Sequence, residues 1–349
     1  MISLSQQGHS VVRMSELTAT EDPIQSLPEA GELEAHLDRH RSELTAYAYR
    51  MLGSAFEAED AVQEAMLRAW RSFDRFEGRS SLRTWLYQIT TNVCLDLLNG
   101  KERRARPMDL GPARSADGPL GDPMPEVTWI EPIPDGRVLV DGGDPAELAA
   151  SRESIRLAFI AALQHLAPRQ RAVLILREVL RWKATEVAQL LETSVASVNS
   201  ALQRARATVE ASHITESEPS RPMDEEQRAL LARYVDAFER YDMDSLTSLL
   251  REDATWNMPP YELWLQTHPD IVKWCLGPGI GCRGSRLIPT VANGSPAFGQ
   301  YKPGDQEGVL EPWSLQVLEI SEGEIVGITF FLDTKTLFPL FGLAPRLEV

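Results

Sequence analysis

Cysteine is scarce in this sequence, and the few that occur are far apart. The 349 residues include three cysteines, Cys94, Cys275 and Cys282. An odd number at wide spacing provides neither a disulfide framework nor a zinc site. We therefore expect three free thiols that pack as small apolar side chains, no metal, no cofactor and a reducing, cytoplasmic environment.

Long apolar runs are lacking as well. No stretch of about eighteen consecutive apolar residues occurs, so we expect no membrane-spanning helix. The first residues lack the basic segment and apolar stretch of a secretory signal. Residues 1–30 are polar and are predicted to form a disordered tail, and the length is typical of two or three domains.

Basic residues do not dominate the sequence, because the formal net charge is −16. This value argues against nucleic-acid binding, but the charge is unevenly distributed. Residues 71–106 hold eight basic and four acidic side chains, and residues 151–213 hold nine and five. Residues 107–150 hold two against nine, and residues 214–349 hold eleven against twenty-one. We therefore expect any DNA-binding surface within the first 213 residues.

Residues 31–105 are predicted to be helical throughout. Apolar side chains recur there at helical spacing in two series: Val62, Met66, Ala69 and Phe73, then Leu82, Trp85, Ile89, Val93 and Leu97. The polar segment Glu77 to Ser81 predicts a turn between the two helices. We interpret Trp70, Phe73 and Trp85 as core aromatic residues.

Residues 107–149 have the composition of a linker. They hold eight prolines, several glycines and many acidic residues, a composition with little helix of its own. Within them, Val127 to Pro134 is apolar enough to dock on another part of the protein. The alternative is a linker that simply lies across a domain surface, and the sequence favours neither interpretation over the other. Residues 214–223, rich in Ser, Glu and Pro, are predicted to form a second linker.

Residues 150–213 are predicted to be helical and to end in a helix-turn-helix. Pro168 can open a helix, and Ser194 can cap the last one. One face of that last helix is apolar and is predicted to point inward: Val195, Val198, Leu202, Ala205 and Val209. The opposite face suits contact with bases and phosphates in the major groove: Ala196, Ser197, Asn199, Ser200, Gln203, Arg204 and Arg206. An ordinary helical hairpin with a solvated polar face is the alternative.

Residues 224–349 follow a different pattern. Amphipathic helices are predicted at 224–241 and 244–251. Strands are predicted near 253–258, 286–292, 309–320 and 324–332. About 120 residues of this kind are expected to form one α+β domain.

Three segments resemble the extracytoplasmic-function sigma factors of the sigma-70 family. Glu57 to Trp70 (EAEDAVQEAMLRAW) is similar to the helix by which these factors bind core RNA polymerase. Phe76 to Asp96 (FEGRSSLRTWLYQITTNVCLD) resembles the segment that opens and reads the −10 promoter element. Leu166 to Arg206 resembles region 4, which reads the −35 element.

The resemblance implies two partners, core RNA polymerase and promoter DNA, and no membrane. It implies polymerase contacts from Asp60, Gln63 and Glu64. Base capture and phosphate contact in the −10 region are assigned to the polar loop and to basic residues near it: Arg79, Ser80, Ser81, Arg83, Lys101, Arg103, Arg104 and Arg106. The family ordinarily has Lys where Asn199 stands, which suggests altered −35 reading. Many members have Gly in the place of Thr267, a minor difference.

The C-terminal portion resembles the SnoaL-like, or NTF2-like, cone-shaped fold. Leu230 to Pro260 is similar to its helix–helix–strand opening, and Gly323 to Asp333 to its last strand. The segments WIEPIPD, SVNSALQRAR and MPPYELW most resemble the sigma factor G type within the family.

A cone of this kind has an internal pocket that could take a small apolar ligand. The residues expected to line it are Trp256, Met258, Trp264, Trp313, Phe331 and Asp333. Asp253, Glu262, His268 and Asp333 are the acid–base candidates. No acid–base pair stands out among them, so we predict no catalysis and favour a regulatory role, in which the domain docks on the linker or on the DNA-binding domains.

The sequence thus predicts a multi-domain protein with two all-α DNA-binding domains and an α+β SnoaL/NTF2-like domain. The predicted bounds are 1–30 for the tail, 31–106 for the region 2 helical bundle, 107–149 for the linker, 150–213 for the region 4 helix-turn-helix, 214–223 for the second linker and 224–349 for the C-terminal domain. The predicted function is promoter-specific transcription initiation with core polymerase, modulated by the C-terminal domain. Two alternatives stay open: an operator-binding helix-turn-helix regulator, and a bifunctional protein whose C-terminal domain binds or turns over a small apolar molecule.

Overall fold

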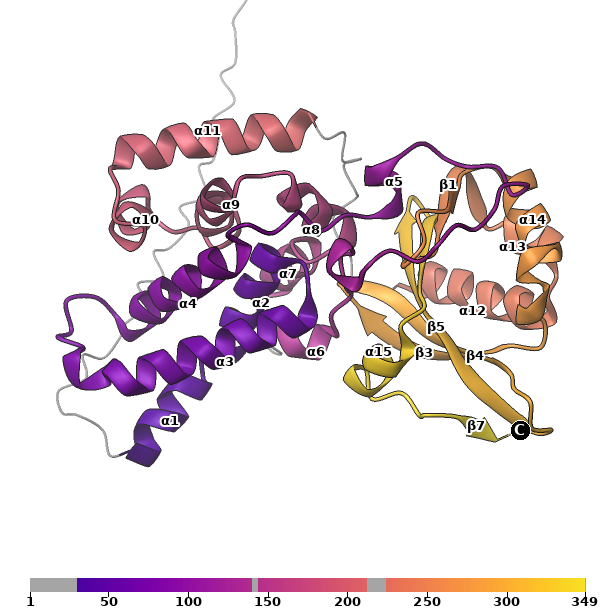
Figure 1. The fold of residues 1–349 in the computed structure, drawn as a ribbon, viewed down its shortest axis with the longest axis horizontal. Coiled ribbons are helices and arrows are strands. Elements are labelled where there is room, and N and C mark those ends of the chain that lie inside the picture. Colours follow the sequence, from indigo (N-terminus) through magenta and orange to yellow (C-terminus); the bar gives the residue numbers. More distant parts are fainter. Residues whose placement is uncertain (1–29, 140–143, 212–223, 349) are drawn as a thin grey trace, which may run out of the picture.

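Helices fill one half of the molecule and a mixed β-sheet fills most of the other (Figure 1). The computed structural model describes residues 30–139, 144–211 and 224–348. Apart from Ala30, the predicted tail at 1–30 lies outside these ranges, and so does the predicted linker at 214–223.

The first helical unit is a bundle of four helices. They are α1 (Ala30–Asp38), α2 (Arg41–Leu52), α3 (Ala55–Ser72) and α4 (Leu82–Leu98), with a 3₁₀ turn at Phe73–Arg75. Ser54 and Ser81 cap α3 and α4 by accepting backbone N–H groups. Phe73 is buried, and Trp85 packs on Phe76 with ring centroids 4.9 Å apart, as expected for core aromatics. The expectation for Trp70 was wrong, because its side chain points outward and is 57% exposed.

The linker is mostly irregular and spans both halves of the molecule. Its helical turns are α5 (Pro107–Leu110), a 3₁₀ turn at Glu126–Thr128 and α6 (Asp135–Val138). Its middle part lies on the C-terminal domain, where Arg114 N–H donates to Trp264 O at 2.9 Å. Trp129, Ile130 and Ile133 are then buried between the two halves. Of the two alternatives for Val127 to Pro134, the docked one is therefore correct.

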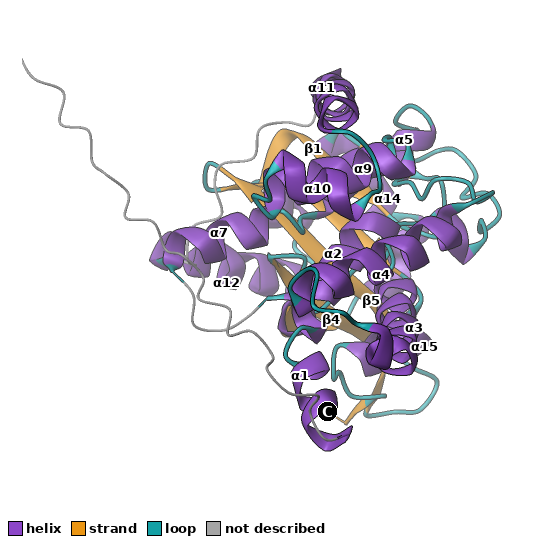
Figure 2. Ribbon diagram, turned by 90° about the vertical axis from the view of Figure 1, so that its left-hand side faces the viewer, coloured by secondary structure: helices purple, strands orange, loops and turns teal. Residues whose placement is uncertain are grey.

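The second helical unit begins within the predicted linker and ends in a helix-turn-helix. Its helices are α7 (Pro145–Glu153), α8 (Leu157–Gln164), α9 (Pro168–Leu174), α10 (Ala184–Leu190) and α11 (Val195–Ala211), with a π-helical turn at Ile175–Val179. Ser194 caps α11 as predicted, since its Oγ accepts Ser197 N–H at 3.1 Å. Val198, Leu202 and Ala205 point inward, whereas Val195 is exposed at the first turn, contrary to expectation. Figures 1 and 2 both show α11 at the periphery.

The C-terminal domain packs three helices on a seven-stranded sheet. The helices are α12 (Glu225–Arg240), α13 (Met243–Thr247) and α14 (His268–Leu276), and α15 (Thr334–Leu340) lies near the C-terminus. The strands are β1 (Leu250–Asn257), β2 (Trp264–Leu265), β3 (Arg286–Ala292), β4 (Ser295–Pro303), β5 (Val309–Ser321), β6 (Glu324–Phe331) and β7 (Leu347–Glu348). The order is β2-β1-β6-β5-β4-β3, β7 pairs with β5, and β1 and β6 run parallel. The predicted helix at 244–251 is shorter than expected because β1 starts at Leu250.

A β-turn of the C-terminal domain contacts the first helical unit, the linker and the start of the second helical unit. The turn Asn293-Gly294 between β3 and β4 inserts where α2, the linker and the region around α7 and α8 meet. The Asn293 side chain is fully buried, and its Nδ2 donates to Tyr49 Oη and to Ile155 O, each at 2.7 Å. Its Oδ1 accepts Ile133 N–H at 3.0 Å, and its own N–H donates to Ile133 O at 3.1 Å.

The conformation of this turn restricts which residues can form it. Asn293 has φ +55° and Gly294 has φ +68°, the left-handed region that Asn and Gly tolerate best. A Cβ on Gly294 would lie 2.8 Å from Arg152 O. Gly294 N–H donates to Asp135 Oδ1 at 2.7 Å, and burial raises the pKa of the Asp135 carboxyl. We call the contacts of Asn293 and Gly294 the junction.

We expect Asn293→Ala to destabilise the full-length protein by about 3 kcal/mol. The change leaves buried groups of Ile133 and Ile155 without partners, and each such group costs about 1–3 kcal/mol. Urea unfolding measures the effect, with the exposed Asn92→Ala in α4 as the matched control. An unfolding curve for Asn293→Ala that overlays the control curve would contradict the role of the junction.

Candidate DNA and polymerase interfaces

The outer face of α3 combines acidic, amide and apolar side chains. Asp60, Gln63 and Leu67 follow helical spacing and are exposed, and the partly exposed Glu64 pairs with Arg68 at 2.7 Å. Leu67 is 42% exposed, and Trp70 extends the same face by one more turn. Apolar side chains of this size on a solvent-exposed helix face are typical of a protein-binding surface.

The predicted base-capture loop is partly exposed. Arg79 projects into solvent and pairs with Glu77 at 3.0 Å. Ser80 is half-buried, and Ser81 is engaged as the cap of α4. In this arrangement Arg79 is therefore the loop side chain best placed to reach a nucleic acid.

Arg83 is held between the two helical units. Its guanidinium pairs with Glu43 at 2.7 Å and lies 5.5 Å from the ring of Trp182, which precedes α10. The ring centroids of Tyr87 and Trp182 are 5.0 Å apart. Burial alone would raise the pKa of Glu43, but hydrogen bonds from His40 and Arg83 lower it overall. Trp182, just before the helix-turn-helix, thus contacts Arg83, a residue predicted to bind −10 DNA.

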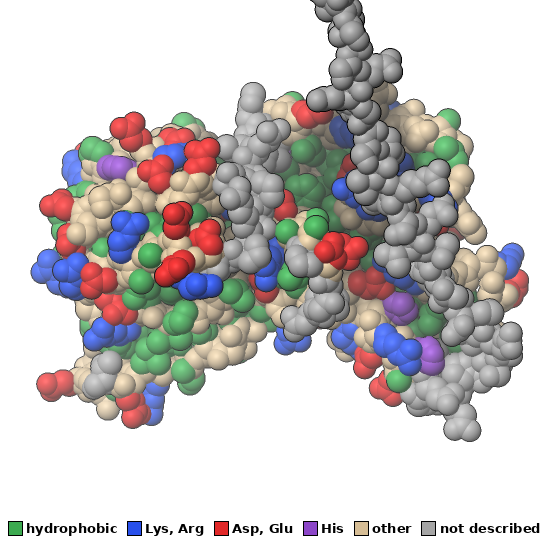
Figure 3. Space-filling view, turned by 180° about the vertical axis from the view of Figure 1, so that it is seen from behind, with side chains coloured by type: hydrophobic (Ala, Val, Ile, Leu, Met, Phe, Trp, Pro, Cys, Tyr) green, Lys and Arg blue, Asp and Glu red, His purple; other side chains and the backbone are tan. Residues whose placement is uncertain are grey.

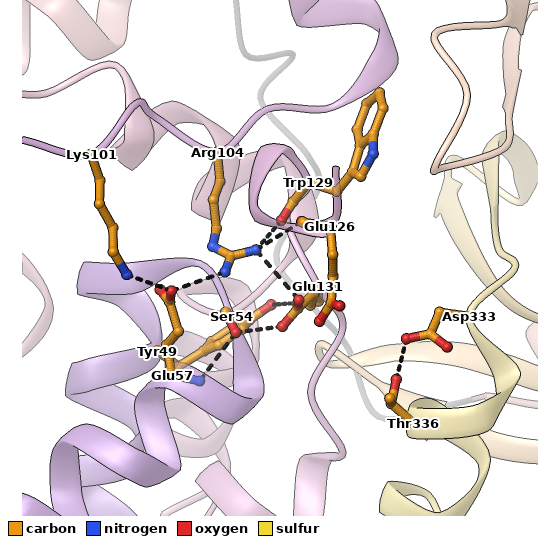
Figure 4. A network of polar contacts seen from close by, with 10 residues as sticks. All are labelled: Tyr49, Ser54, Glu57, Lys101, Arg104, Glu126, Trp129, Glu131, Asp333 and Thr336. Carbon is orange, nitrogen blue, oxygen red and sulfur yellow. Dashed lines mark hydrogen bonds and ion pairs between the residues drawn. The ribbon is translucent and has the colours of Figure 1, made fainter. Parts of the chain in front are cut away.

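Arg104 is buried in this arrangement and is not exposed for the predicted phosphate contact. It donates to Trp129 O at 2.6 Å, and pairs with Glu57 at 3.2 Å and Glu131 at 3.4 Å (Figure 4). Lys101 donates to the same Glu57 carboxylate at 2.8 Å. By contrast, Arg103 is exposed and hydrogen-bonds His165. The structure therefore assigns Arg104 to holding the linker on α3.

Glu131 is the other charged residue at this contact. Its carboxylate accepts the Ser54 hydroxyl and a guanidinium N–H of Arg104. Burial raises the pKa of Glu131 from its ordinary value of 4.5 to about 7, although Arg104 and Ser54 lower it and the neighbouring Glu126 raises it further. Glu131 thus gains a proton in the range where cellular pH varies.

The outer face of α11 is open to solvent. All seven residues predicted to read the −35 element are exposed: Ala196, Ser197, Asn199, Ser200, Gln203, Arg204 and Arg206. Arg206 pairs with Glu178 at 2.6 Å. Seen from behind, the C-terminal half mixes acidic and basic side chains and presents no basic face (Figure 3). The helix-turn-helix is therefore the better candidate for groove contact.

The residues predicted for one C-terminal pocket are divided between two cavities. Trp256, Met258 and Trp313 line a cavity of about 40 Å³ inside the domain, far smaller than the roughly 300–1,000 Å³ of a typical small-molecule site. Trp313, Phe331 and Asp333 line a cavity of about 580 Å³ between the domain and the linker. Trp264 belongs to neither lining, and its Nε1 donates to Gly111 O at 2.9 Å.

The four acid–base candidates do not converge. Asp253 pairs with Arg251 at 2.5 Å, and Glu262 pairs with Arg114 at 2.6 Å. His268 Nε2 lies 3.1 Å from Arg251 O, while Asp333 accepts the Thr336 hydroxyl. Within residues 30–139, 144–211 and 224–348 there is no group of three side chains arranged to bind a metal. The helices of these ranges include none that is long and apolar enough to cross a bilayer.

Two family models match this chain. Sigma-70 region 2 matches residues 37–104, and Sigma-70, region 4 matches residues 156–209. The sequence is 47% identical over 324 residues to the ECF RNA polymerase sigma factor SigG of Mycobacterium tuberculosis, with 91% of this chain and 85% of the relative covered.

The chain belongs to the extracytoplasmic-function sigma factors. It binds core RNA polymerase and directs promoter-specific transcription initiation. This sigma factor is also 27% identical to the probable sigma factor SigI of the same organism over 86% of this chain and 93% of the relative. The crystal structure of Mycobacterium tuberculosis SigJ superposes with a TM-score of 0.57 at 22% identity, covering 90% of this chain and all of SigJ. The shared fold includes the NTF2-like C-terminal domain.

Sequence reasoning missed two features of these surfaces. Leu67 and Trp70 continue the helical spacing of Asp60 and Gln63, so the periodicity of α3 could have placed them on the outer face. The buried position of Arg104 has no local signal, because its partner Glu131 lies 27 residues away in an irregular segment.

We expect Leu67→Ala and Trp70→Ala each to weaken binding to core polymerase about tenfold or more. Exposed apolar side chains at the centre of an interface contribute most of its affinity, while their loss changes folding stability little. Binding is measured by titration of labelled core enzyme. The matched control is Leu276→Ala in α14, which is 51% exposed on the C-terminal domain. Equal affinities for all three variants would remove α3 as the polymerase-binding face.

We expect the free energy of unfolding contributed by Glu131 to fall as pH rises from about 4.5 to about 7. In this pH range the folded chain keeps a proton on the Glu131 carboxyl, whereas the unfolded chain has released it. The folded state therefore binds more protons, and the free energy of unfolding falls as pH rises. Glu131→Gln removes this dependence and stabilises the protein at pH 8 relative to the parent.

Urea unfolding at pH 5 and pH 8 measures this effect. Glu307→Gln, an exposed glutamate in the β4–β5 loop, serves as the control. A Glu131→Gln variant with the same pH dependence as the control would show that this carboxyl is ionised throughout.

Proposed function

We propose that this sigma factor is closed when free, and that its C-terminal domain holds it closed until polymerase and promoter DNA are engaged. The observation that carries the proposal is Asn293, whose side chain bonds to Tyr49 of α2, Ile133 of the linker and Ile155 before α8. Because one residue of the C-terminal domain bonds to all three parts, separating any of them breaks the junction.

The closed arrangement is incompatible with simultaneous reading of both promoter elements. Positions −10 and −35 are about 25 base pairs apart, or about 85 Å of duplex at ~3.4 Å per base pair. In the closed chain, Tyr87 of α4 contacts Trp182 beside the helix-turn-helix, and Gln88 Nε2 donates to Glu192 Oε1 at 3.4 Å. A helix of seventeen residues spans about 25 Å, so α4 and the helix-turn-helix cannot reach both elements while Trp182 and Glu192 contact α4.

The residue roles follow from this proposal. Arg79, Ser80 and Arg103 are accessible for −10 contacts in the closed chain, and Arg83 becomes available on opening. The outer face of α11 is proposed to read the −35 element, with Asn199 and Gln203 suited to adenine and Arg204 to guanine or phosphate. The outer face of α3 is proposed to bind core polymerase in the cytoplasm.

Catalysis in the C-terminal domain is the weaker candidate. Asp253, Glu262 and His268 each have partners outside the small cavity, so no side-chain pair is arranged for proton transfer. An operator-binding regulator fits the chain less well, because such a function does not account for the first helical unit, which matches Sigma-70 region 2.

Reconstituted transcription tests the proposal. We expect Asn293→Ala, and separately the chain truncated after His213, to yield more transcript than the full-length protein with sigma-free core polymerase. The start sites should be unchanged, because neither change alters the proposed DNA-reading surfaces. Sequencing of 5′ ends on a sheared genomic template measures both quantities. Transcript levels equal to those of the full-length protein for both forms would overturn the closed-state proposal.

A further inference from the structure

A cavity of about 580 Å³ lies between the C-terminal domain and the rest of the molecule. Its walls come from Phe56 of α3, from linker residues 123–132, and from residues 259–261, 312–313 and 331–337 of the C-terminal domain. This volume is typical of a small-molecule site. Because the walls belong to separate units, the cavity exists in the closed arrangement and is lost when the units separate.

The walls carry acidic groups without basic ones. Glu126, Glu131 and Asp333 line the cavity, and none of its lining residues is Lys, Arg or His. Figure 4 shows the two glutamates on the linker side and Asp333 across from them. Arg104, behind the wall, pairs with Glu131 and Glu57, so it does not offset Glu126 and Asp333. The wall chemistry therefore favours a cation.

The rest of the lining is apolar and rich in rings. Phe56, Trp129, Tyr261 and Phe331 contribute to it, together with five prolines. Trp313 lines it as well, and the Nζ of Lys302 already lies 3.3 Å from the centroid of its ring. Aromatic faces attract organic cations and also bury the apolar body of a ligand. An inorganic cation would leave most of this surface without a partner.

One polar atom in the wall lacks a partner. Trp129 is only 4% exposed. Its indole Nε1 is buried and has no hydrogen-bond acceptor among the described residues. Figure 4 shows the indole on the side of the linker that faces the C-terminal domain. The ring of Trp129 lines the cavity, but its N–H is covered by protein, so this residue offers a ligand its aromatic surface.

We propose that this cavity binds a small hydrophobic organic cation, a protonated amine on an aromatic body. The ammonium lies between Glu126 and Asp333, and the body packs on the aromatic walls, the ring of Trp129 among them. Because the ligand contacts α3, the linker and the C-terminal domain at once, it binds the closed chain in preference to the open one. That last consequence rests on the proposed function, whereas the binding itself does not.

Three probes that share one body and differ in charge test the site. They are 4-methoxyphenethylamine, the neutral 4-methoxyphenethyl alcohol and the anionic 3-(4-methoxyphenyl)propanoate. Each is titrated into the full-length protein and followed by NMR of the tryptophan indole N–H signals. We expect the amine to bind about tenfold or more tightly than the alcohol or the acid, and to shift the Trp129 signal.

Single substitutions test which carboxylates of the cavity bind the ammonium group. Asp333→Asn and Glu126→Gln should each weaken amine binding about tenfold, and Trp129→Phe should remove the shifted signal. Asp253→Asn, an exposed carboxylate of the same domain outside the cavity, is the matched control and should bind the amine as the parent protein does. Equal binding of the three probes, no binding of the amine at millimolar concentration, or unchanged binding by both acidic variants would each overturn the site.

The same amine in reconstituted transcription separates the site from the closed-state proposal. We expect it to reduce transcription by the full-length protein and to leave transcription by the full-length Asp333→Asn variant unaffected. Selective binding without any effect on transcription would overturn the coupling to closure while the site stands. Absence of binding, with increased transcription by Asn293→Ala, would overturn the site while the closed-state proposal stands.

Discussion

The arrangement of this sigma factor depends on the hydrogen bonds of one buried asparagine. Asn293 uses both amide protons, its side-chain oxygen and its backbone N–H to join α2, the linker and the chain before α8 to the C-terminal domain. An amide side chain can donate and accept at once, and Asn tolerates the left-handed backbone of the turn. Inside an apolar core these bonds are costly to break, because each freed group is left without water.

The closed arrangement affects the functional surfaces unequally. Arg83 lies against Trp182 and Arg104 holds the linker, so part of the basic surface near α4 is engaged within the protein. The outer faces of α3 and α11 remain exposed. The proposed polymerase and −35 contacts can therefore form before the junction opens, and the energy of those contacts is available to open it. Glu131 and the adjacent cavity lie at the same boundary, where protonation or a bound cation would change the balance.

The sequence predicts the parts of the structure that depend on local patterns. Helical periodicity and the capping residue Ser194 predict the helix-turn-helix, and alternating patterns predict β1, β3, β5 and β6. The predictions fail where long-range contacts decide. Trp70 is exposed and Arg104 is buried, since partners remote in sequence set their environments. Asn293-Gly294 is a recognisable hairpin dipeptide, but no local pattern indicates that the turn docks on Tyr49, 244 residues away.

The C-terminal pocket shows the same limit. Trp256, Trp313 and Phe331 were expected around one cavity because the fold resemblance suggested it, but side-chain packing nearly fills the interior of the domain. The larger cavity requires linker residues 123–132 as one wall. Only the docked position of the linker creates it, and composition alone left that position undecided.

The most direct test of the account is the distance between the two helical units in solution. Fluorophores attached through unnatural amino acids at Asn92 in α4 and Glu210 in α11 report it by single-molecule energy transfer. The account predicts one high-efficiency state for the free protein and a low-efficiency state in the complex with core polymerase and promoter DNA. The same efficiency in the free protein and in the complex would contradict it.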